Sequence, residues 1–250
     1  MSAFEGKVVF VTGAGTGIGQ AIARQFAAAG AKVLIGARRE GPLRETCAYA
    51  PEAISWVKMD LTNQRDRVRA LEAAMERHGR LDVLVNNAGN QLCKPFLDQT
   101  EDEIDACIDT NLISTAKLIL RAVPLLKVTR GNIVNISSTA GRFAPMPSAG
   151  LTTYSATRGG MNQLTRTLAT ELGPIGIRIN AVAPGLTFGE VAKEMLLNDE
   201  SRLDGLKAIT PLGRIGQPDD IARSVLFLAG DEWLTGQVLD SSGGWWIGGG

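Results

Sequence analysis

The sequence predicts an α/β protein in which a parallel sheet is covered by helices on both faces. Short, almost uninterrupted apolar runs alternate with longer amphipathic stretches, which is the pattern of strands buried on both faces and joined by helices. No internal repeat or Pro/Ser-rich linker divides the 250 residues, and a chain that is 44% hydrophobic and 21% charged can bury one sizeable core. We therefore expect a single domain over residues 1–250.

The elements follow from these two periodicities. Seven apolar runs rich in β-branched residues predict strands at Lys7–Val11, Lys32–Gly36, Ile54–Lys58, Leu81–Val85, Gly131–Ile136, Ile177–Ala183 and Gln237–Leu239. The amphipathic stretches between them predict helices at Gly17–Ala29, Gln64–Arg77, Glu101–Leu126, Thr153–Leu172 and Pro218–Leu228. Leu186–Gly213 shows neither period, and because long loops in compact domains often act as lids, we expect a substrate loop there.

Composition argues against several classes of function. The 26 basic and 26 acidic residues balance, and no basic stripe with interleaved aromatic residues occurs, so we expect no nucleic acid and no membrane as partner. The N-terminus lacks an apolar signal core, which favours a soluble, cytoplasmic protein. Cys47, Cys93 and Cys107 lack C-x-x-C spacing, which favours reduced thiols over a disulfide or a metal site. A single histidine, His78, argues against a Ser-His-Asp hydrolase.

A glycine-rich segment follows the first predicted strand. Its residues are Thr12-Gly13-Ala14-Gly15-Thr16-Gly17-Ile18-Gly19, with the spacing G-x-x-x-G-x-G. Glycines let the backbone turn tightly and approach a pyrophosphate, while the N-terminus of the following helix offers free N–H groups. A tight turn that binds nothing is the alternative, but the position at the start of a βαβ unit favours binding.

Further landmarks follow in a fixed order along the chain. They are Asn86-Asn87-Ala88-Gly89, Asn111, Ser138, Tyr154, Pro184-Gly185, Pro211–Gly216 and Gly236-Gln237. Together with the glycine-rich segment, this ordered set resembles the short-chain dehydrogenase/reductase family over nearly the whole chain. The resemblance implies a Rossmann fold, a doubly wound seven-stranded parallel sheet, with cofactor and substrate at the carboxyl ends of the strands. It also implies hydride transfer between a nicotinamide and a carbonyl or secondary alcohol substrate.

The resemblance assigns catalytic roles to the polar landmarks. Tyr154 would act as general acid/base on the substrate oxygen. Ser138 would donate a hydrogen bond to that oxygen, with Ser137 as the nearby alternative. Asn111 would bend its helix and free a backbone carbonyl for water, whereas an asparagine exposed to solvent is the alternative. Tyr154 follows Ser138 by sixteen positions, which exceeds the family's usual interval, so we expect a local insertion within Arg142–Gly150.

Arg158 stands four residues after Tyr154, where the family has lysine. Residues four apart share a helix face, so the guanidinium would lie under the phenol. Phenols are poor bases at neutral pH, and a nearby cation stabilises the phenolate. Arginine keeps the charge but not the compact ammonium, which in the family bonds ribose hydroxyls and passes protons through water toward the asparagine. We expect catalysis to persist with an altered relay; a catalytically silent, NADP-binding regulatory or scaffolding protein is the alternative.

The choice of cofactor depends on the end of the second predicted strand. Ala37 stands where NAD-preferring relatives would carry aspartate, and Arg38 and Arg39 follow it. A guanidinium suits the 2′-phosphate of NADP, so we expect NADP(H) rather than NAD(H). A solvated basic turn that binds no phosphate is the alternative, and the nearby Glu40 keeps it open.

Other cofactor contacts are implied for the later strand ends. By resemblance Asp60 and Leu61 would lie at the adenine ring, although Asp60 could instead cap the helix expected to begin near Gln64. The amides of the Asn86-Asn87 pair can bridge neighbouring strands. The remaining expected contacts are Asn87, Ala88, Gly89, Tyr154, Arg158, Pro184, Gly185 and Thr187.

Substrate and assembly are indicated only by class. The candidate pocket walls suit a small or mid-sized alcohol or ketone; they are Gln91, Cys93, Pro145, Met146, Ser148, Leu186 and Phe188. Between Glu190 and Lys207, five carboxylates against three basic groups provide no clamp for an anionic substrate such as a coenzyme A ester. The apolar segment Trp245-Trp246-Ile247 favours a subunit interface. Family members are mostly tetramers, so we expect a homotetramer or homodimer, with the helices at Glu101 and Thr153 as dimer faces.

Overall fold

A seven-stranded parallel sheet forms the centre of the computed structural model, which describes residues 3–143, 150–189 and 200–245. The strands are β1 (Val8–Thr12), β2 (Lys32–Ala37), β3 (Ile54–Lys58), β4 (Val83–Asn86), β5 (Asn132–Ile136), β6 (Arg178–Pro184) and β7 (Val238–Ser241). Their order across the sheet is β3-β2-β1-β4-β5-β6-β7. The predicted fold is confirmed, and every expected strand is present with its ends displaced by at most two residues.

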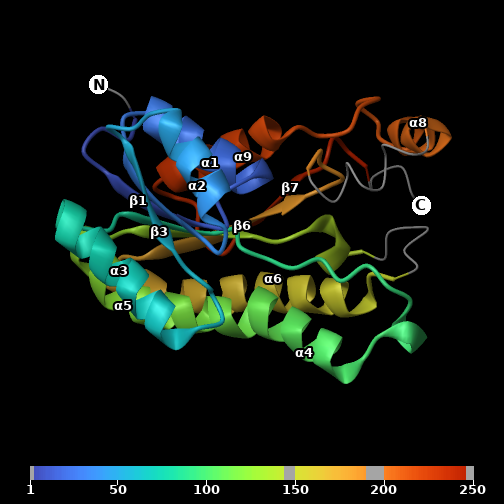
Figure 1. The fold of residues 1–250 in the computed structure, drawn as a ribbon, viewed down its shortest axis with the longest axis horizontal. Coiled ribbons are helices and arrows are strands. Elements are labelled where there is room, and N and C mark those ends of the chain that lie inside the picture. Colours follow the sequence, from blue (N-terminus) through green and yellow to red (C-terminus); the bar gives the residue numbers. More distant parts are fainter. Residues whose placement is uncertain (1–2, 144–149, 190–199, 246–250) are drawn as a thin grey trace.

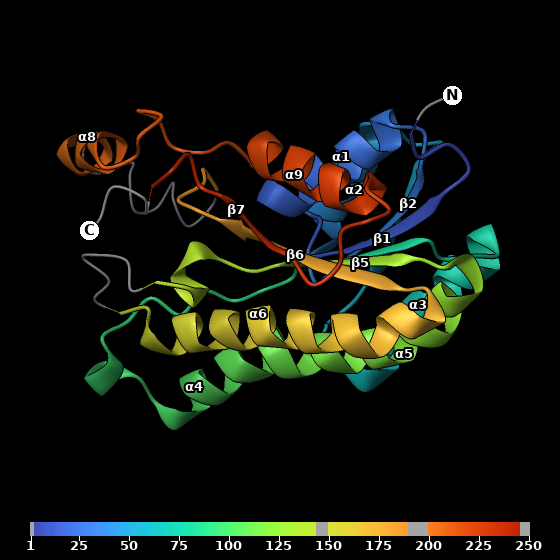
Figure 2. The ribbon, with the colours of Figure 1, turned by 180° about the vertical axis from the view of Figure 1, so that it is seen from behind.

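Helices cover both faces of this sheet, as Figure 1 shows and the view from behind in Figure 2 repeats. One layer contains α1 (Gly17–Ala28), α2 (Glu40–Ala48) and α9 (Pro218–Gly230). The other contains α3 (Gln64–His78), α4 (Glu101–Ile108), α5 (Ser114–Thr129) and α6 (Thr152–Leu172). The chain runs outward from β1 to β3, returns to β4 and then runs outward the other way, so the strand order reverses between β1 and β4. In open α/β sheets such a reversal is where ligands bind.

The side chains of β1 explain why the central strands read as continuous apolar runs. Val9 and Val11 belong to the core between the sheet and the α1/α9 layer, whereas Phe10 belongs to the core on the α3/α5 side. Successive side chains of a strand point to opposite faces, so a strand covered on both sides needs an apolar residue at every position. Burying each such side chain contributes roughly 1.5–3 kcal/mol to folding.

Three helical segments differ from the prediction. Helix α2 and helix α8 (Glu200–Ala208) lie where no helix was expected, so the expected loop Leu186–Gly213 is wrong over α8. The single helix expected at Glu101–Leu126 is divided into α4 and α5 by a π turn over Asp109–Ile113. This turn carries Asn111, which is 0% exposed, so the solvent-exposed alternative for Asn111 is wrong.

Strand β3 forms one outer edge of the sheet, and two arginines of α3 contact it there. Arg69 Nη2 donates to the carbonyl of Lys58 at 2.8 Å, and Arg77 Nη1 donates to the carbonyl of Trp56 at 3.1 Å. The carbonyls on the outer side of an edge strand have no neighbouring strand to pair with. The two guanidinium groups therefore occupy acceptors that the sheet itself leaves free.

Candidate active site

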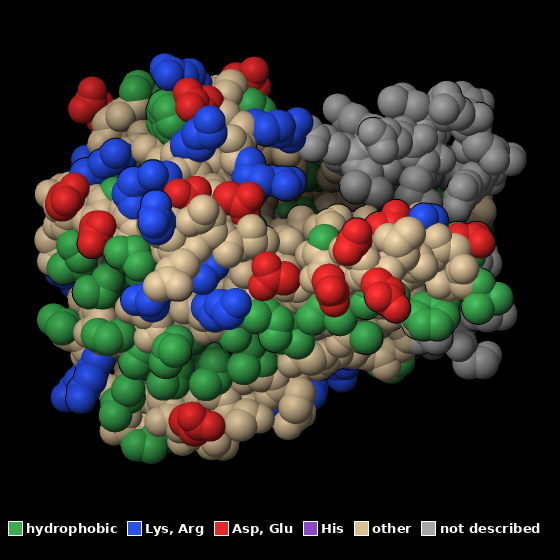
Figure 3. Space-filling model, turned by 60° about the horizontal axis from the view of Figure 1, so that its bottom comes forward, with side chains coloured by type: hydrophobic (Ala, Val, Ile, Leu, Met, Phe, Trp, Pro, Cys, Tyr) green, Lys and Arg blue, Asp and Glu red, His purple; other side chains and the backbone are tan. Residues whose placement is uncertain are grey.

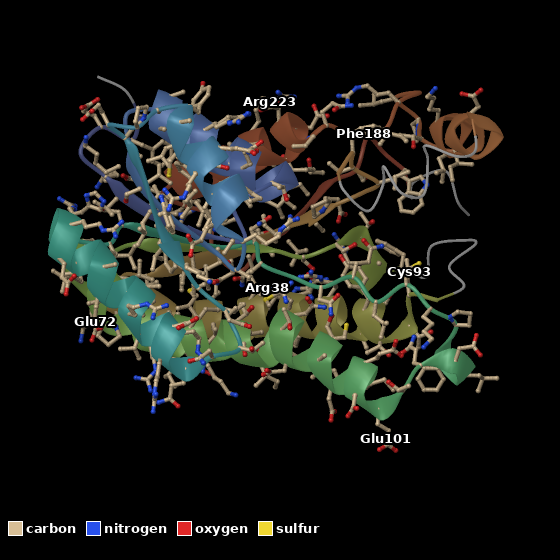
Figure 4. All side chains as sticks on the ribbon, viewed as in Figure 1. Arg38, Glu72, Cys93, Glu101, Phe188 and Arg223 are labelled. Carbon is tan, nitrogen blue, oxygen red and sulfur yellow. The ribbon has the colours of Figure 1, made fainter. Side chains whose placement is uncertain are left out.

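A cleft of about 900 Å³ opens at the carboxyl ends of the strands. All predicted cofactor contacts line it, and so do the predicted catalytic residues Ser138, Tyr154 and Arg158, whereas the fourth predicted catalytic residue, Asn111, does not. Figure 4 shows Arg38 near the middle of the molecule and Phe188 farther to the right, so the expected phosphate subsite and substrate wall occupy different parts of the molecule. His78 does not line the cleft.

The glycine-rich segment lines one side of the cleft, and some of its positions have no room for a side chain. Gly13 has a φ of 67°, and a Cβ added there would lie 2.7 Å from the Cα of Ala88. A Cβ on Gly19 would lie 2.5 Å from the carbonyl oxygen of Gly13. Thr16, the N-cap of α1, makes no side-chain capping bond, so the first N–H groups of the helix stay available to a ligand. Only glycines therefore allow this segment to pack so closely against the neighbouring backbone.

Thr12 and Asn87 fix this segment to the end of β4. The Thr12 hydroxyl oxygen accepts hydrogen bonds from the backbone N–H groups of Asn87 and Ala88, both at 3.1 Å. In return Asn87 Nδ2 donates to the carbonyls of Thr12 at 2.9 Å and Gly13 at 3.0 Å. Its neighbour Asn86 donates through Nδ2 to Asn135 Oδ1 at 2.8 Å, which joins β4 to β5 side chain to side chain.

Basic and acidic side chains at the end of β2 have separate environments. Arg38 is exposed and makes no hydrogen bond or ion pair with any described residue. Glu40 forms ion pairs with Arg44 at 3.7 Å and with Lys58 at 3.6 Å. The guanidinium of Arg38 is therefore free to meet a ligand, whereas the Glu40 carboxylate is already paired.

The alternative in which Asp60 caps the third helix is wrong. Asn63 is the N-cap of α3 and accepts from Arg65 N at 2.8 Å. Asp60 instead accepts from the backbone N–H and the hydroxyl of Thr62, at 2.9 and 2.8 Å. This closed turn holds Asp60 and Leu61 at the cleft, where the second carboxylate oxygen faces no described donor.

The two adjacent serines at the end of β5 differ in what their hydroxyls can do. Ser137 is 3% exposed and donates to Asn162 Oδ1 at 2.6 Å and toward the Arg158 carbonyl at 3.2 Å. Ser138 is half-buried, and its oxygen accepts from Ala140 N at 3.1 Å. Accepting leaves the hydroxyl hydrogen of Ser138 free to donate to a substrate. The geometry therefore favours Ser138 over Ser137.

Arg158 lies under the ring of Tyr154, as the helical spacing predicts. Its Cζ is 4.9 Å from the ring centroid, and the residue is 6% exposed. Nη1 donates to the Ile136 carbonyl at 3.0 Å, and Nη2 lies 3.5 Å from Asn111 Oδ1. A Cβ on Gly89 would collide with Nη2. The Tyr154 hydroxyl makes no hydrogen bond with a described residue, so it is available in the cleft.

Asn111 connects the loop after β4 with the helix that carries Tyr154. Its Oδ1 accepts from Asn90 N and its Nδ2 donates to the Asn90 carbonyl, both at 2.7 Å. Nδ2 also lies 3.3 Å from Thr157 Oγ1, and that hydroxyl donates to the carbonyl of Tyr154 at 2.7 Å. Cys107 Sγ lies 3.3 Å from the same amide, and burial raises the pKa of this thiol.

The predicted substrate walls are only partly present in the cleft. Gln91, Leu186 and Phe188 line it. Cys93 is exposed and does not line the cleft, so that prediction is wrong. Trp245, expected at a subunit interface, lines the cleft. Pro145, Met146, Ser148, Trp246 and Ile247 lie outside the described residues.

Sequence reasoning missed other residues of the cleft. Asn90, Asp109, Thr139 and Leu151 line it without having been predicted. Asn90 and Thr139 carried a signal, because they directly follow the Asn86–Gly89 and Ser138 landmarks. In the described ranges no helix is long and apolar enough to span a bilayer, and the described acidic, cysteine and histidine side chains form no group that could hold a metal. The three cysteines are unpaired, as predicted.

Several known proteins are similar to this chain in sequence or in fold. An uncharacterized oxidoreductase of Methylorubrum extorquens is 39% identical over 251 residues, covering 98% of this chain and 99% of that protein. The 3-oxoacyl-[acyl-carrier-protein] reductase FabG of Thermotoga maritima is 37% identical over 246 residues, covering 96% and 98%.

Solved structures agree with these sequence matches. A short-chain dehydrogenase/reductase of unknown function from Caenorhabditis elegans, solved with cofactor, superposes with a TM-score of 0.90 at 28% identity over 98% of this chain and 97% of that chain. A glucose dehydrogenase of the same organism gives 0.85 at 34% identity over 98% and 99%. The model of the short chain dehydrogenase family matches residues 7–200. The chain therefore belongs to the short-chain dehydrogenase/reductase family, whose oxidoreductases use a nicotinamide cofactor.

Proposed function

We propose that the protein is an NADP(H)-dependent reductase of carbonyl compounds, or in the reverse direction a dehydrogenase of secondary alcohols. One observation carries the proposal: Tyr154, whose hydroxyl has no described partner and whose ring lies against a buried guanidinium, lines the same cleft as Ser138, whose hydroxyl hydrogen is also free. A proton donor and a second hydrogen-bond donor facing one cavity suit a developing alkoxide.

The residues at the other end of the cleft fit a dinucleotide. Gly13 and Gly19 let the glycine-rich backbone pack directly against its neighbours at this end of the cleft. The uncapped start of α1 offers N–H groups to the charge of a pyrophosphate. Arg38, free of described partners, suits a 2′-phosphate and supports NADP(H) over NAD(H). When bound, the nicotinamide supplies or accepts the hydride.

The roles of the chain's own residues follow from their contacts. Ser138 donates to the substrate oxygen and orients it. Tyr154 gives its phenolic proton to that oxygen during reduction, and the cation 4.9 Å from the ring centroid stabilises the phenolate left behind. Asn111 and Thr157 hold the first turn of α6 in place through the Tyr154 carbonyl. The buried guanidinium is fixed by Ile136, which suits electrostatic support better than a mobile proton relay.

The substrate class is inferred from one relative and from the walls of the cleft. The relative from Thermotoga maritima is named as a 3-oxoacyl-[acyl-carrier-protein] reductase, which makes β-keto thioesters reasonable candidates. The cleft residues Leu151, Leu186, Phe188 and Trp245 form apolar walls that suit an uncharged ketone of small or medium size. A panel of substrates should therefore contain both ketones and 3-oxoacyl thioesters.

The experiment measures NADPH consumption over this panel for the wild type, Tyr154→Phe and Tyr49→Phe. We expect turnover that Tyr154→Phe reduces by about 100-fold or more, because the proton donor is lost. Tyr49 is 55% exposed and does not line the cleft, so Tyr49→Phe is the matched control and should retain full activity.

Two results would contradict the proposal. Equal turnover by Tyr154→Phe and wild type would remove Tyr154 from the chemistry. A wild type that binds NADPH, measured by cofactor fluorescence, but turns over nothing in the panel would favour the silent binding protein. That second result would gain weight if Arg158→Lys restored turnover, because arginine would then be the disabling change.

A further inference from the structure

We propose that Lys58 determines cofactor specificity by neutralising Glu40, so that the subsite beside Arg38 remains cationic. The inference rests on the proposed use of NADP(H) and assigns the preference to a second residue, on a neighbouring strand. Lys58 ends β3, and neither the glycine-rich segment nor the end of β2 contains it. Its effect would be indirect, because its ammonium contacts the carboxylate.

The sheet places Lys58 beside the position on which the cofactor choice depends. In the parallel pairing of β2 with β3, Ala37 is the register partner of Lys58. Register partners in a sheet project their side chains from the same face. Ala37 lines the cleft next to Arg38, so the Lys58 stem starts on the same face beside the proposed 2′-phosphate subsite. Lys58 and Glu40 do not line the cleft themselves, so they would act on its charge from beside it.

Glu40 is the group that would oppose a phosphate here. It begins α2 two residues after Arg38, and a carboxylate near the end of β2 would repel a dianion and could accept from a ribose hydroxyl. Lys58 Nζ lies 3.6 Å from its Oε1, and Arg44 Nη2 lies 3.7 Å from its Oε2. Both carboxylate oxygens therefore face a cation.

Lys58 is the more decisive of the two cations. The guanidinium of Arg44 also stacks over the ring of Trp56, with Cζ 4.9 Å from the centroid, so it interacts with that ring as well as with Glu40. The Lys58 ammonium contacts no other described residue than Glu40. Its side chain is 63% exposed and that of Glu40 is 43% exposed, so the pair adds little to folding stability while it sets the local charge.

The test compares the binding of 2′,5′-ADP and 5′-AMP, which differ by the 2′-phosphate, using isothermal titration calorimetry at low salt. We expect the wild type to prefer 2′,5′-ADP. Lys58→Met should weaken 2′,5′-ADP binding by roughly three- to tenfold and leave 5′-AMP binding unchanged, because a screened charge at this position acts mainly on the nearby 2′-phosphate, which 5′-AMP lacks. The double variant Glu40→Gln/Lys58→Met should bind 2′,5′-ADP as the wild type does.

A matched control removes the same charge elsewhere. Lys127 is exposed in the last turn of α5 and does not line the cleft, so Lys127→Met should leave both affinities unchanged. Thermal midpoints for every variant exclude misfolding as the cause of weaker binding.

The outcomes separate this inference from the proposed function. A wild type that binds the two nucleotides equally would overturn the NADP(H) assignment itself. A wild type that prefers 2′,5′-ADP, with Lys58→Met unchanged, would leave that assignment standing and overturn the role of Lys58. If Lys58→Met and the double variant were equally weak, Lys58 would act without Glu40, and the proposed neutralisation would be wrong.

Discussion

The guanidinium of Arg158 sits in surroundings that match its width. Its two terminal nitrogens reach different partners, the Ile136 carbonyl and Asn111 Oδ1, while its plane lies under the Tyr154 ring. Gly89 leaves the space that Nη2 occupies. A lysine ammonium would have to serve both partners from a single nitrogen, whereas the guanidinium presents a separate nitrogen to each. The surroundings of this residue therefore suit arginine. We would not expect such a fit if arginine had merely replaced lysine in a site that lost its function.

We expect Gly89→Ala to interact with Arg158→Lys. In the wild type the new methyl group would run into Nη2, and such overpacking costs about 1–3 kcal/mol of unfolding free energy. In an Arg158→Lys background the terminal nitrogen is gone, so the same methyl group should cost less than half as much. Urea unfolding of the four proteins in the double-mutant cycle measures the coupling. Additive losses would mean that the Gly89 position is restricted by something other than Arg158.

Residues in local motifs were predictable, and residues brought in by tertiary proximity were not. Ser138 and Gly185 follow strands directly, and parallel strands carry their ends to one edge, so their presence in the cleft follows from the sequence pattern. Trp245 and Leu151 reach the cleft from segments whose course no periodicity fixes. The choice between Ser137 and Ser138 depended on the position of Asn162, twenty-five residues away from Ser137.

At the scale of elements, α2 shows how a helix can begin where the sequence suggests a break. Gly41 and Pro42 follow Glu40, and this pair normally marks a turn. Proline lacks the N–H that the first helical turn leaves unpaired anyway, so it is tolerated there. The π turn between α4 and α5 is the reverse case, a break that the sequence does not announce. The apolar helical period continues through Asn111, but the backbone there departs from the regular α-helix.

The start of α9 should make stability depend on acid pH. The hydrogen bonds from Arg214 lower the pKa of Asp220 from 3.8 to about 2. Because the folded value is the lower one, the stabilisation is complete above pH 3.8 and is lost as pH falls through about 2. Asp220→Asn should therefore cost roughly 1 kcal/mol at neutral pH, after allowance for solvent screening. The difference from wild type should vanish near pH 2.

Chemical unfolding at neutral pH and at several acid values measures this difference. Asp219→Asn is the control, since it removes a charge from the same helical turn, where Asp219 Oδ1 accepts from Gln25 Nε2 rather than from an arginine. A difference for Asp220→Asn that stayed constant over the whole acid range would show that the Arg214 pair does not account for it.

For the molecule as a whole, apolar side chains remain exposed on the helices of one layer. Figure 3 shows hydrophobic side chains gathered in a band across the face that the α3 to α6 layer presents. Along the π turn and α5, Ile113, Leu120 and Val128 are 41%, 74% and 85% exposed. Long apolar stripes of this kind usually meet a partner. The proposal that the chain forms a homodimer or homotetramer through its long helices rests on this face.

A charge at the centre of that stripe should separate the subunits. We expect Leu120→Glu to lower the molar mass measured by light scattering after gel filtration, because an unpaired carboxylate would be buried at the interface. Leu212→Glu serves as the control, since Leu212 is 66% exposed but lies outside the long helices. An unchanged mass for Leu120→Glu, or a wild type that is already monomeric, would rule out this face as the interface.

Arg69 and Arg77, which contact the outer strand β3, should affect how readily the protein aggregates at high concentration. An uncovered edge strand can recruit a strand from another molecule and start an ordered aggregate. Arg69 and Arg77 fill two of the acceptors that such a strand would use on β3, and their side chains obstruct its approach. An oligomer formed through the helices, as proposed above, would therefore leave this edge of the sheet protected against growth into a fibre.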